Sequence, residues 1–220
     1  MAKRNVVTRR KLLKVAGGAV GVGIAACGGT AYFGTRSPAK VVFPYSTCPS
    51  FDDKRLLVTY ASKSGATGEI AARITTSLCN SGYAVDLKHF PDVRDISTYS
   101  GFVMGSPVYM GRVMGSFVSF IEKFQQGLRS RPSAFFGVGL TMKEDSPENR
   151  TEMDTYFAPA IDALQPEKIN YFGGRIKMDT LPFLYRVFAQ ADTEGILTEG
   201  DYRDWNAIDN WANQLAEDLI

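Results

Sequence analysis

The chain has 220 residues, of which 45% are hydrophobic and 22% charged, so it can form the core of one domain and is not disordered overall. Its formal charge is +2, but residues 1–26 carry six basic and no acidic residues, which leaves 19 basic against 23 acidic residues, a net charge of −4, for the rest. We therefore expect no nucleic-acid partner, because such binding needs a basic patch on the folded domain. With one histidine, His89, and no C-x-x-C or C-x-x-H spacing, we also expect no metal site.

The N-terminus, residues 1–26, has the features of an export signal. A basic stretch with the pair Arg9-Arg10 precedes an uncharged, mildly apolar segment that ends at Ala26. The arginine pair resembles the twin-arginine export motif. The sequence Ile-Ala-Ala-Cys that ends at Cys27 resembles a bacterial lipobox, which predicts lipidation of Cys27. The alternative is an uncleaved anchor over residues 15–35, and both alternatives tether the domain to the outer face of the cytoplasmic membrane.

Residues 27–54 contain many Gly, Ser, Pro and Thr residues and are expected to be a linker. Cys48 in this segment could pair with Cys79 in an oxidising compartment. A buried free thiol at Cys79 is an equally good interpretation, because Cys79 lies one position past an apolar helix stripe.

Strand and helix patterns alternate from residue 55 to the end of the chain. Short apolar runs predict strands at 56–60, 83–88, 102–105, 134–140 and 169–176. Apolar periodicity predicts helices over 70–78, 117–128, 151–164 and 204–219. This alternation predicts an α/β domain over residues 55–220, with a doubly wound, five-stranded parallel sheet in three layers.

The loop after the first strand, residues 61–68, is suited to phosphate binding. It offers the hydroxyls of Ser62, Ser64 and Thr67, and Gly65 lets the backbone turn so that several N–H groups converge. The helix that follows adds its free N–H groups and the positive end of its dipole. The alternative is an ordinary helix N-cap, for which Ser and Thr are also preferred. Neither the G-x-x-x-x-G-K-[ST] nor the G-x-G-x-x-G pattern is present in the sequence.

Residues 60–67, Tyr-Ala-Ser-Lys-Ser-Gly-Ala-Thr, resemble the FMN phosphate loop of the flavodoxin family, and the resemblance extends over residues 55–220. It implies a flavodoxin-like fold and non-covalently bound FMN, with the flavin ring held by the loops after the third and fourth strands. The cofactor-binding residues expected on this basis are Ser62, Lys63, Ser64, Gly65, Ala66, Thr67, Pro107, Val108, Tyr109, Met110, Gly111, Leu140, Thr141 and Met142. Tyr109 either stacks on the ring or is a surface or packing tyrosine.

Four further segments resemble the flavodoxin-type, quinone-dependent protoporphyrinogen oxidases. They are residues 105–111, 147–150, 173–176 and 202–205. This resemblance implies an FMN-dependent oxidoreductase that acts on a quinone or a small organic substrate, but it maps no catalytic residue onto the chain. The alternatives are an exported flavodoxin that carries electrons to a redox protein, and a domain that has lost its flavin and serves as a binding module.

The segment Leu181–Ala191 has no counterpart in a minimal flavodoxin. It is rich in apolar side chains and contains Arg186, and Arg175 and Lys177 precede it closely in the sequence. Apolar surface beside cations could dock an anionic amphiphile or a membrane interface. The alternative is an ordinary helix packed on the core.

Overall fold

The computed structural model describes residues 41–49, 54–181, 183–190 and 197–218. The predicted export signal and Cys27 lie outside these residues. Within the described part of the chain, no helix has the length and apolar character needed to cross a membrane.

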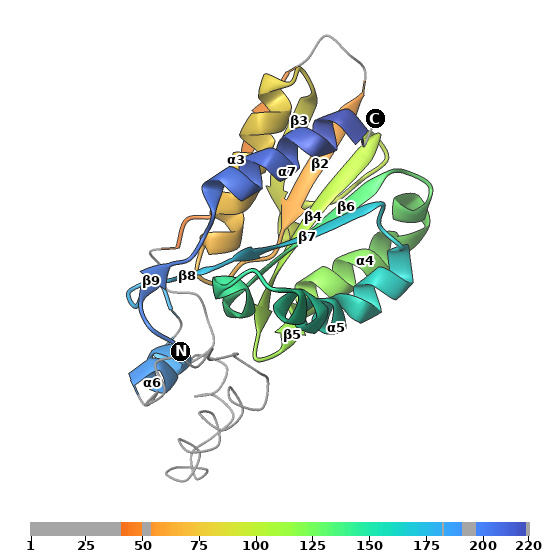
Figure 1. Cartoon of the computed structure of the whole chain (residues 1–220). Helices are drawn as coiled ribbons and strands as arrows, with labels where there is room; N and C mark the ends of the chain where they lie inside the picture. Colours follow the sequence, from red (N-terminus) through yellow and green to blue (C-terminus); the bar gives the residue numbers. More distant parts are fainter. Residues whose placement is uncertain (1–40, 50–53, 182, 191–196, 219–220) are drawn as a thin grey trace.

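A parallel sheet forms the centre of the molecule (Figure 1). Its parallel strands are β2 (Arg55–Tyr60), β3 (Ala84–His89), β4 (Gly101–Tyr109), β6 (Ser133–Gly139) and β7 (Lys168–Gly173). Their order is β3-β2-β4-β6-β7, so the chain leaves β2 to form β3 on one side and then returns to form β4 on the other. This order confirms the predicted doubly wound fold and places the topological switch point at the carboxyl end of β2.

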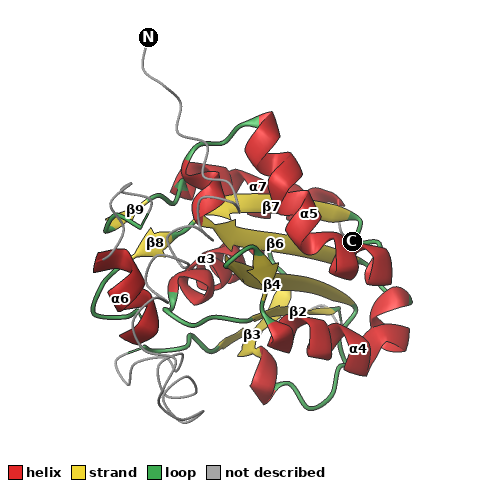
Figure 2. Cartoon of the chain, turned by 90° about the horizontal axis from the view of Figure 1, so that it is seen from below, coloured by secondary structure: helices red, strands yellow, loops and turns green. Residues whose placement is uncertain are grey.

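Helices cover both faces of this sheet and complete the predicted three layers (Figure 2). One face carries α3 (Ala66–Asn80) and α7 (Trp205–Asp218), and the other carries α4 (Gly115–Arg129) and α5 (Pro147–Leu164). Alternate residues of β2 point to opposite faces, so Leu56 and Val58 pack under α3 and α7 while Leu57 packs under α4 and α5. Both faces of the strand are thus buried, which explains its continuous apolar run.

The structure differs from the sequence-based expectation in three places. β4 continues to Tyr109, where β5 (Arg112–Val113) pairs with it, so part of the predicted loop is strand. The predicted strand 169–176 is divided, because its end forms β8 (Arg175–Ile176), which pairs outside the main sheet with β9 (Gly200–Asp201). The strand β1 (Ser46–Cys48) was not predicted at all, since its short polar sequence has no apolar periodicity.

β1 extends the sheet by antiparallel pairing with β3, so the expected linker ends in an element that packs on the domain. A disulfide joins Cys48 of β1 to Cys79 near the end of α3, with a Cα–Cα distance of 6.1 Å. Of the two alternatives for Cys79, the structure thus shows the paired one. The two cysteines are 31 residues apart, and a closed loop of this size is worth about 3–4 kcal/mol in the chain-entropy description.

Helix α3 begins directly after Gly65, whose backbone is left-handed with φ 90° and ψ −23°. A residue with a Cβ is strained in this region, so the turn that joins β2 to α3 requires glycine. The sequence predicts that Gly65 lets the backbone turn here, and its left-handed conformation confirms this prediction.

Gly65→Ala is therefore expected to lower the free energy of unfolding by roughly 1–2 kcal/mol, because it forces a side chain into the left-handed region. Gly115→Ala is the matched control, since Gly115 begins α4 without a positive φ and has open space around its Cα hydrogens. This control should be neutral or stabilising by up to about 1 kcal/mol. Urea unfolding of both variants measures the difference, and equal midpoints would contradict the assignment of strain to Gly65.

Candidate functional site

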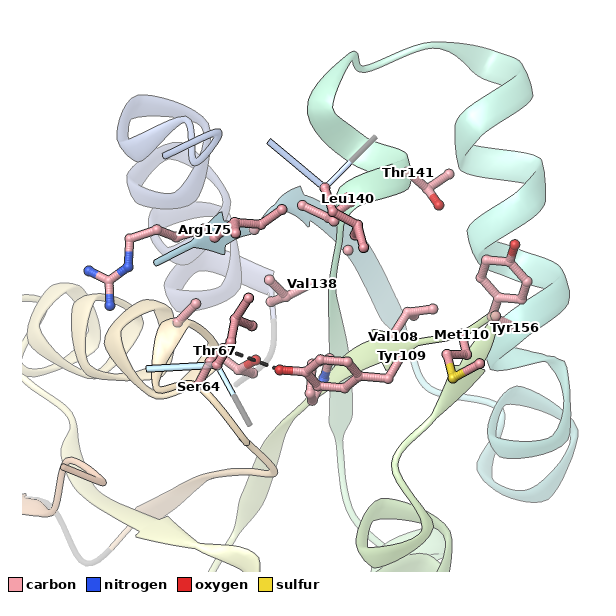
Figure 3. A pocket seen from close by; sticks show the side chains of 18 residues that line it. Ser64, Thr67, Val108, Tyr109, Met110, Val138, Leu140, Thr141, Tyr156 and Arg175 are labelled. Carbon is pink, nitrogen blue, oxygen red and sulfur yellow. Dashed lines mark hydrogen bonds between the residues drawn. The ribbon is translucent and has the colours of Figure 1, made fainter. Parts of the chain in front are cut away.

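A pocket opens at the carboxyl ends of the parallel strands, beside the switch point (Figure 3). Three chain segments form its main walls: the loop from β2 to α3, the end of β4, and the end of β6 with the short 3-10 helix η2 (Leu140–Lys143). Residues of α5, of the segment around β8, and Leu181 and Leu197 complete the lining. Most of its lining side chains are apolar. The lining residues are Ser64, Ala66, Thr67, Pro107, Val108, Tyr109, Met110, Gly111, Val138, Gly139, Leu140, Thr141, Tyr156, Gly174, Arg175, Ile176, Leu181 and Leu197.

The loop from β2 to α3 presents polar groups to one end of the pocket. Ser62, Ser64 and Thr67 are each less than 9% exposed, which is low for hydroxyl residues in a surface loop. The Ser62 hydroxyl accepts a hydrogen bond from the Gly65 amide at 3.0 Å and so tightens the turn. The N-cap residue of α3 is Gly65, which has no side chain that could cap the N–H groups of the first turn. The first-turn N–H groups, together with the helix dipole, therefore form a site suited to an anion.

The end of β4 forms a second wall. Met110 and Gly111 make the tight turn to β5 with φ values of 50° and 71°, and Met110 remains 43% exposed. A left-handed non-glycine residue is uncommon and concentrates at ligand sites. The Tyr109 hydroxyl lies 3.2 Å from the Ser64 hydroxyl, so this wall and the polar loop are in direct contact (Figure 3).

The third wall comes from the end of β6 and from α5. Leu140 and Thr141 of η2 line the pocket, and Tyr156 reaches it from α5. The start of α5 is fixed by the Ser146 hydroxyl, which accepts a hydrogen bond from the Asn149 amide at 3.2 Å.

The antiparallel strands β8 and β9 form a hairpin whose long connection contains α6 (Phe183–Gln190). A group of ion pairs holds this β8–β9 hairpin against the first turn of α3. The Arg175 guanidinium donates two hydrogen bonds, at 2.9 and 2.6 Å, to the Glu69 carboxylate. Arg203, whose side chain is 4% exposed, donates to the same carboxylate and also makes two hydrogen bonds to Asp201. These hydrogen bonds hold the pKa of Asp201 below its usual value. The hairpin thereby supplies Gly174, Arg175 and Ile176 to the pocket.

The helix α6 (Phe183–Gln190) lies beyond this hairpin, away from the helices that cover the sheet (Figures 1 and 2). Phe183 and Val187 are 63% and 38% exposed, and neither belongs to a core cluster. Leu181, just before the helix, is buried and lines the pocket. Leu181 therefore lies at the pocket, while Phe183 and Val187 are outside the core clusters.

Ten of the predicted cofactor-binding residues line the pocket, and four do not. Ser62 and Gly65 form the turn of the loop through their mutual hydrogen bond and the left-handed backbone of Gly65. The Lys63 ammonium lies 5.3 Å from the centre of the Tyr109 ring. Burial lowers the pKa of Lys63. Met142 is 4% exposed and packs in the core under α4 and α5, so its side chain faces away from the pocket.

Sequence reasoning missed the pocket residues Val138, Gly139, Tyr156, Gly174, Arg175, Ile176, Leu181 and Leu197. Val138 and Gly139 directly precede the predicted Leu140, so a wider window at that strand end would have included them. Tyr156 lies on a helix whose approach to the pocket has no local sequence signal. Arg175 and Leu181 were noted for charge and apolar character, but only the folded hairpin places them at the pocket.

The sequence profile of the flavodoxin domain family matches residues 57–192. The chain is 23% identical over 173 residues to protoporphyrinogen IX dehydrogenase [quinone] of Escherichia coli K12, covering 74% of this chain and 94% of that protein. It is 24% identical over 178 residues to the Leishmania major protein of the same name, covering 74% of each. Among solved structures, oxidised flavodoxin 2 of Bacillus cereus gives a TM-score of 0.49 at 21% identity, covering 74% of this chain and 98% of that one. Because the family profile spans more than half of the sequence, this chain belongs to the flavodoxin domain family.

Proposed function

We propose that this protein binds FMN non-covalently and acts as an oxidoreductase that passes electrons from an organic substrate to a quinone. The observation that carries the proposal is the uncapped start of α3, which opens into a mainly apolar pocket at the switch point of the sheet. A helix N-terminus favours a phosphate dianion, and apolar walls favour a planar flavin ring. Family membership implies a flavin cofactor. A loop without the G-x-G-x-x-G pattern of dinucleotide sites supports FMN.

The three walls of the pocket have separate tasks in this proposal. The amides of Ala66 and Thr67, with the hydroxyls of Ser64 and Thr67, bind the phosphate, while the Ser62 hydroxyl holds the turn at Gly65 that directs these groups. Val108, Tyr109 and Leu140 enclose the ring and exclude water, and Tyr109 would also stack on it. Bound flavin supplies the electron-transfer chemistry, so the protein needs only to bind and orient the reactants.

A quinone acceptor is supported by the relatives and by the site. The relatives from E. coli and L. major are both named as quinone-dependent protoporphyrinogen IX dehydrogenases. In this chain Leu181 and Leu197 add to the apolar lining of the pocket, and Phe183, two residues after Leu181, is exposed. An apolar entrance of this kind suits a quinone or a porphyrinogen. Each cycle would remove two electrons and two protons from the substrate and deliver them to the quinone to give a quinol.

We further propose that the protein is exported and held at the outer face of the cytoplasmic membrane, through lipidated Cys27 or an uncleaved leader. The Cys48–Cys79 disulfide supports this location, because disulfides persist in oxidising compartments and are rare in the cytosol. The basic leader with its arginine pair supports it independently.

Replacing Ser62, Ser64 and Thr67 together by alanine should remove most bound FMN, because two hydroxyl donors to the phosphate and the Ser62 acceptor that holds the turn are lost. Affinity is measured by the recovery of free-flavin fluorescence. The control is Thr76→Ala/Ser81→Ala, which removes two exposed hydroxyls that donate to carbonyls of α3 outside the loop. Riboflavin, which lacks the phosphate, should bind the triple variant and the parent equally well. FMN binding as tight in the triple variant as in the parent would overturn the assignment of the loop.

The reaction is tested with the FMN-loaded protein after anaerobic reduction. We expect a soluble short-chain quinone to reoxidise the protein at a rate that rises with quinone concentration, and protoporphyrinogen to reduce it again. Stopped-flow absorbance follows both steps. Failure of both half-reactions would reject the enzyme. A redox titration in separate one-electron steps, with fast exchange only with a redox protein, would identify an electron carrier instead.

Export is tested with Arg9→Lys/Arg10→Lys, which should block the twin-arginine route and keep the protein in the cytoplasm. In that variant Cys48 and Cys79 are expected to react with a thiol-alkylating reagent, whereas in the parent they are not. The control is Lys11→Arg, which preserves the charge and the arginine pair. A parent protein that resists external protease in spheroplasts would contradict the proposed location.

A further inference from the structure

Residues 41–48, which we call the N-terminal strap, run along the outer side of the loop from β2 to α3. A Cβ placed on Gly65 would lie 3.5 Å from Cγ1 of Val41. A Cβ placed on Gly68 would lie 2.9 Å from Cδ of Pro44, which is closer than real side chains allow. The strap is therefore in direct contact with the backbone of the loop and of the first turn of α3.

Side chains of the domain hold the strap in this position. The Tyr60 hydroxyl, at the end of β2, donates a hydrogen bond to the Pro44 carbonyl at 2.9 Å. The Phe43 ring stacks on His89 at the end of β3, with ring centres 4.5 Å apart and an interplanar angle of 9°. Burial against these neighbours lowers the pKa of His89, which favours its neutral form.

The other end of the strap is anchored covalently. Its last residues form β1, which pairs with β3 from Ser46 to Cys48, and the disulfide ties Cys48 to Cys79. Cys79 lies at the far end of α3 from Gly65. The strap thus spans α3 from its last turn to its first and is fixed at both ends.

We propose that the strap is part of the flavin site and acts as a positioning element for the phosphate loop. It presses on the side of Gly65 and Gly68 where a Cβ would be and keeps the left-handed turn closed, so that the amides of the loop converge before the phosphate arrives. A loop that is already ordered loses less conformational freedom on binding, which strengthens affinity without any new contact. The strap itself does not line the pocket.

This inference rests on the proposed function, because it concerns phosphate bound at that loop. It predicts a specific split between two ligands. Loosening the strap should weaken FMN, whose phosphate needs the ordered amides, and should leave riboflavin unaffected, since riboflavin carries the same ring without the phosphate. A general loss of stability would instead weaken both ligands together.

The test uses two variants of the full chain, prepared free of flavin. Cys48→Ser/Cys79→Ser releases the covalent anchor, and Tyr60→Phe removes only the hydrogen bond to Pro44. We expect the dissociation constant for FMN to rise about five-fold or more in the first and about two-fold in the second. Titration of flavin fluorescence measures both ligands, and Tyr60→Phe keeps the test decisive if the cysteine variant fails to fold.

The matched control is Leu215→Ala, which truncates a fully buried side chain of α7 and changes no residue or anchor of the strap. This variant should bind FMN like the parent at temperatures where it is folded. Unchanged FMN affinity in both strap variants, or an equal loss of FMN and riboflavin, would overturn the inference. A parent that binds neither flavin would instead reject the proposed function, so the two failures are distinguishable.

Discussion

The site depends on one constraint: the backbone must leave a buried parallel strand and enter a helix within a few residues, without a side chain to cap that helix. Gly65 makes this possible by adopting a left-handed conformation that other residues reach only with strain. The N–H groups of the first turn of α3 are then directed at the carboxyl edge of the sheet. Since the chain adds β3 on one side of β2 and β4 on the other, the connections leave this edge in opposite directions and leave room for a ligand.

The remaining walls of the pocket are supplied by departures from a minimal sheet. β4 continues into a tight hairpin at Met110 and Gly111, which brings Tyr109 to the polar loop. β7 is followed by a segment that leaves the sheet to pair with β9. The ion pairs of Glu69 with Arg175 and Arg203 hold this second hairpin next to α3, and the charges largely cancel within the group. The hairpin therefore contributes shape and apolar surface to the pocket more than net charge.

The strap and its disulfide connect the flavin site to the part of the chain that leads towards the N-terminus. The partly buried Phe43 and the hydrogen bond to the Pro44 carbonyl order this apolar segment, in which Val42 and Tyr45 remain exposed, and the covalent link to α3 offsets part of the cost of ordering it. If the protein is exported through its leader, the disulfide would form where it is chemically stable. The disulfide that is stable after export would then be the same bond that anchors the strap and helps to order the phosphate loop.

The sequence by itself determined the central architecture and the polar loop. Apolar runs such as 56–60 bury both faces, and the helical stripe of Ile70, Ile74 and Leu78 follows from local periodicity, so both are readable without a structure. Hydroxyls and a glycine at fixed offsets after the first strand are equally local. Only the tertiary structure decided that β1 joins the sheet, that Cys48 meets Cys79, and that Tyr156, Arg175 and Leu197 reach the pocket. These contacts join residues far apart in the chain, and the spacing of residues along a sequence carries no record of which distant segments the folded chain brings together.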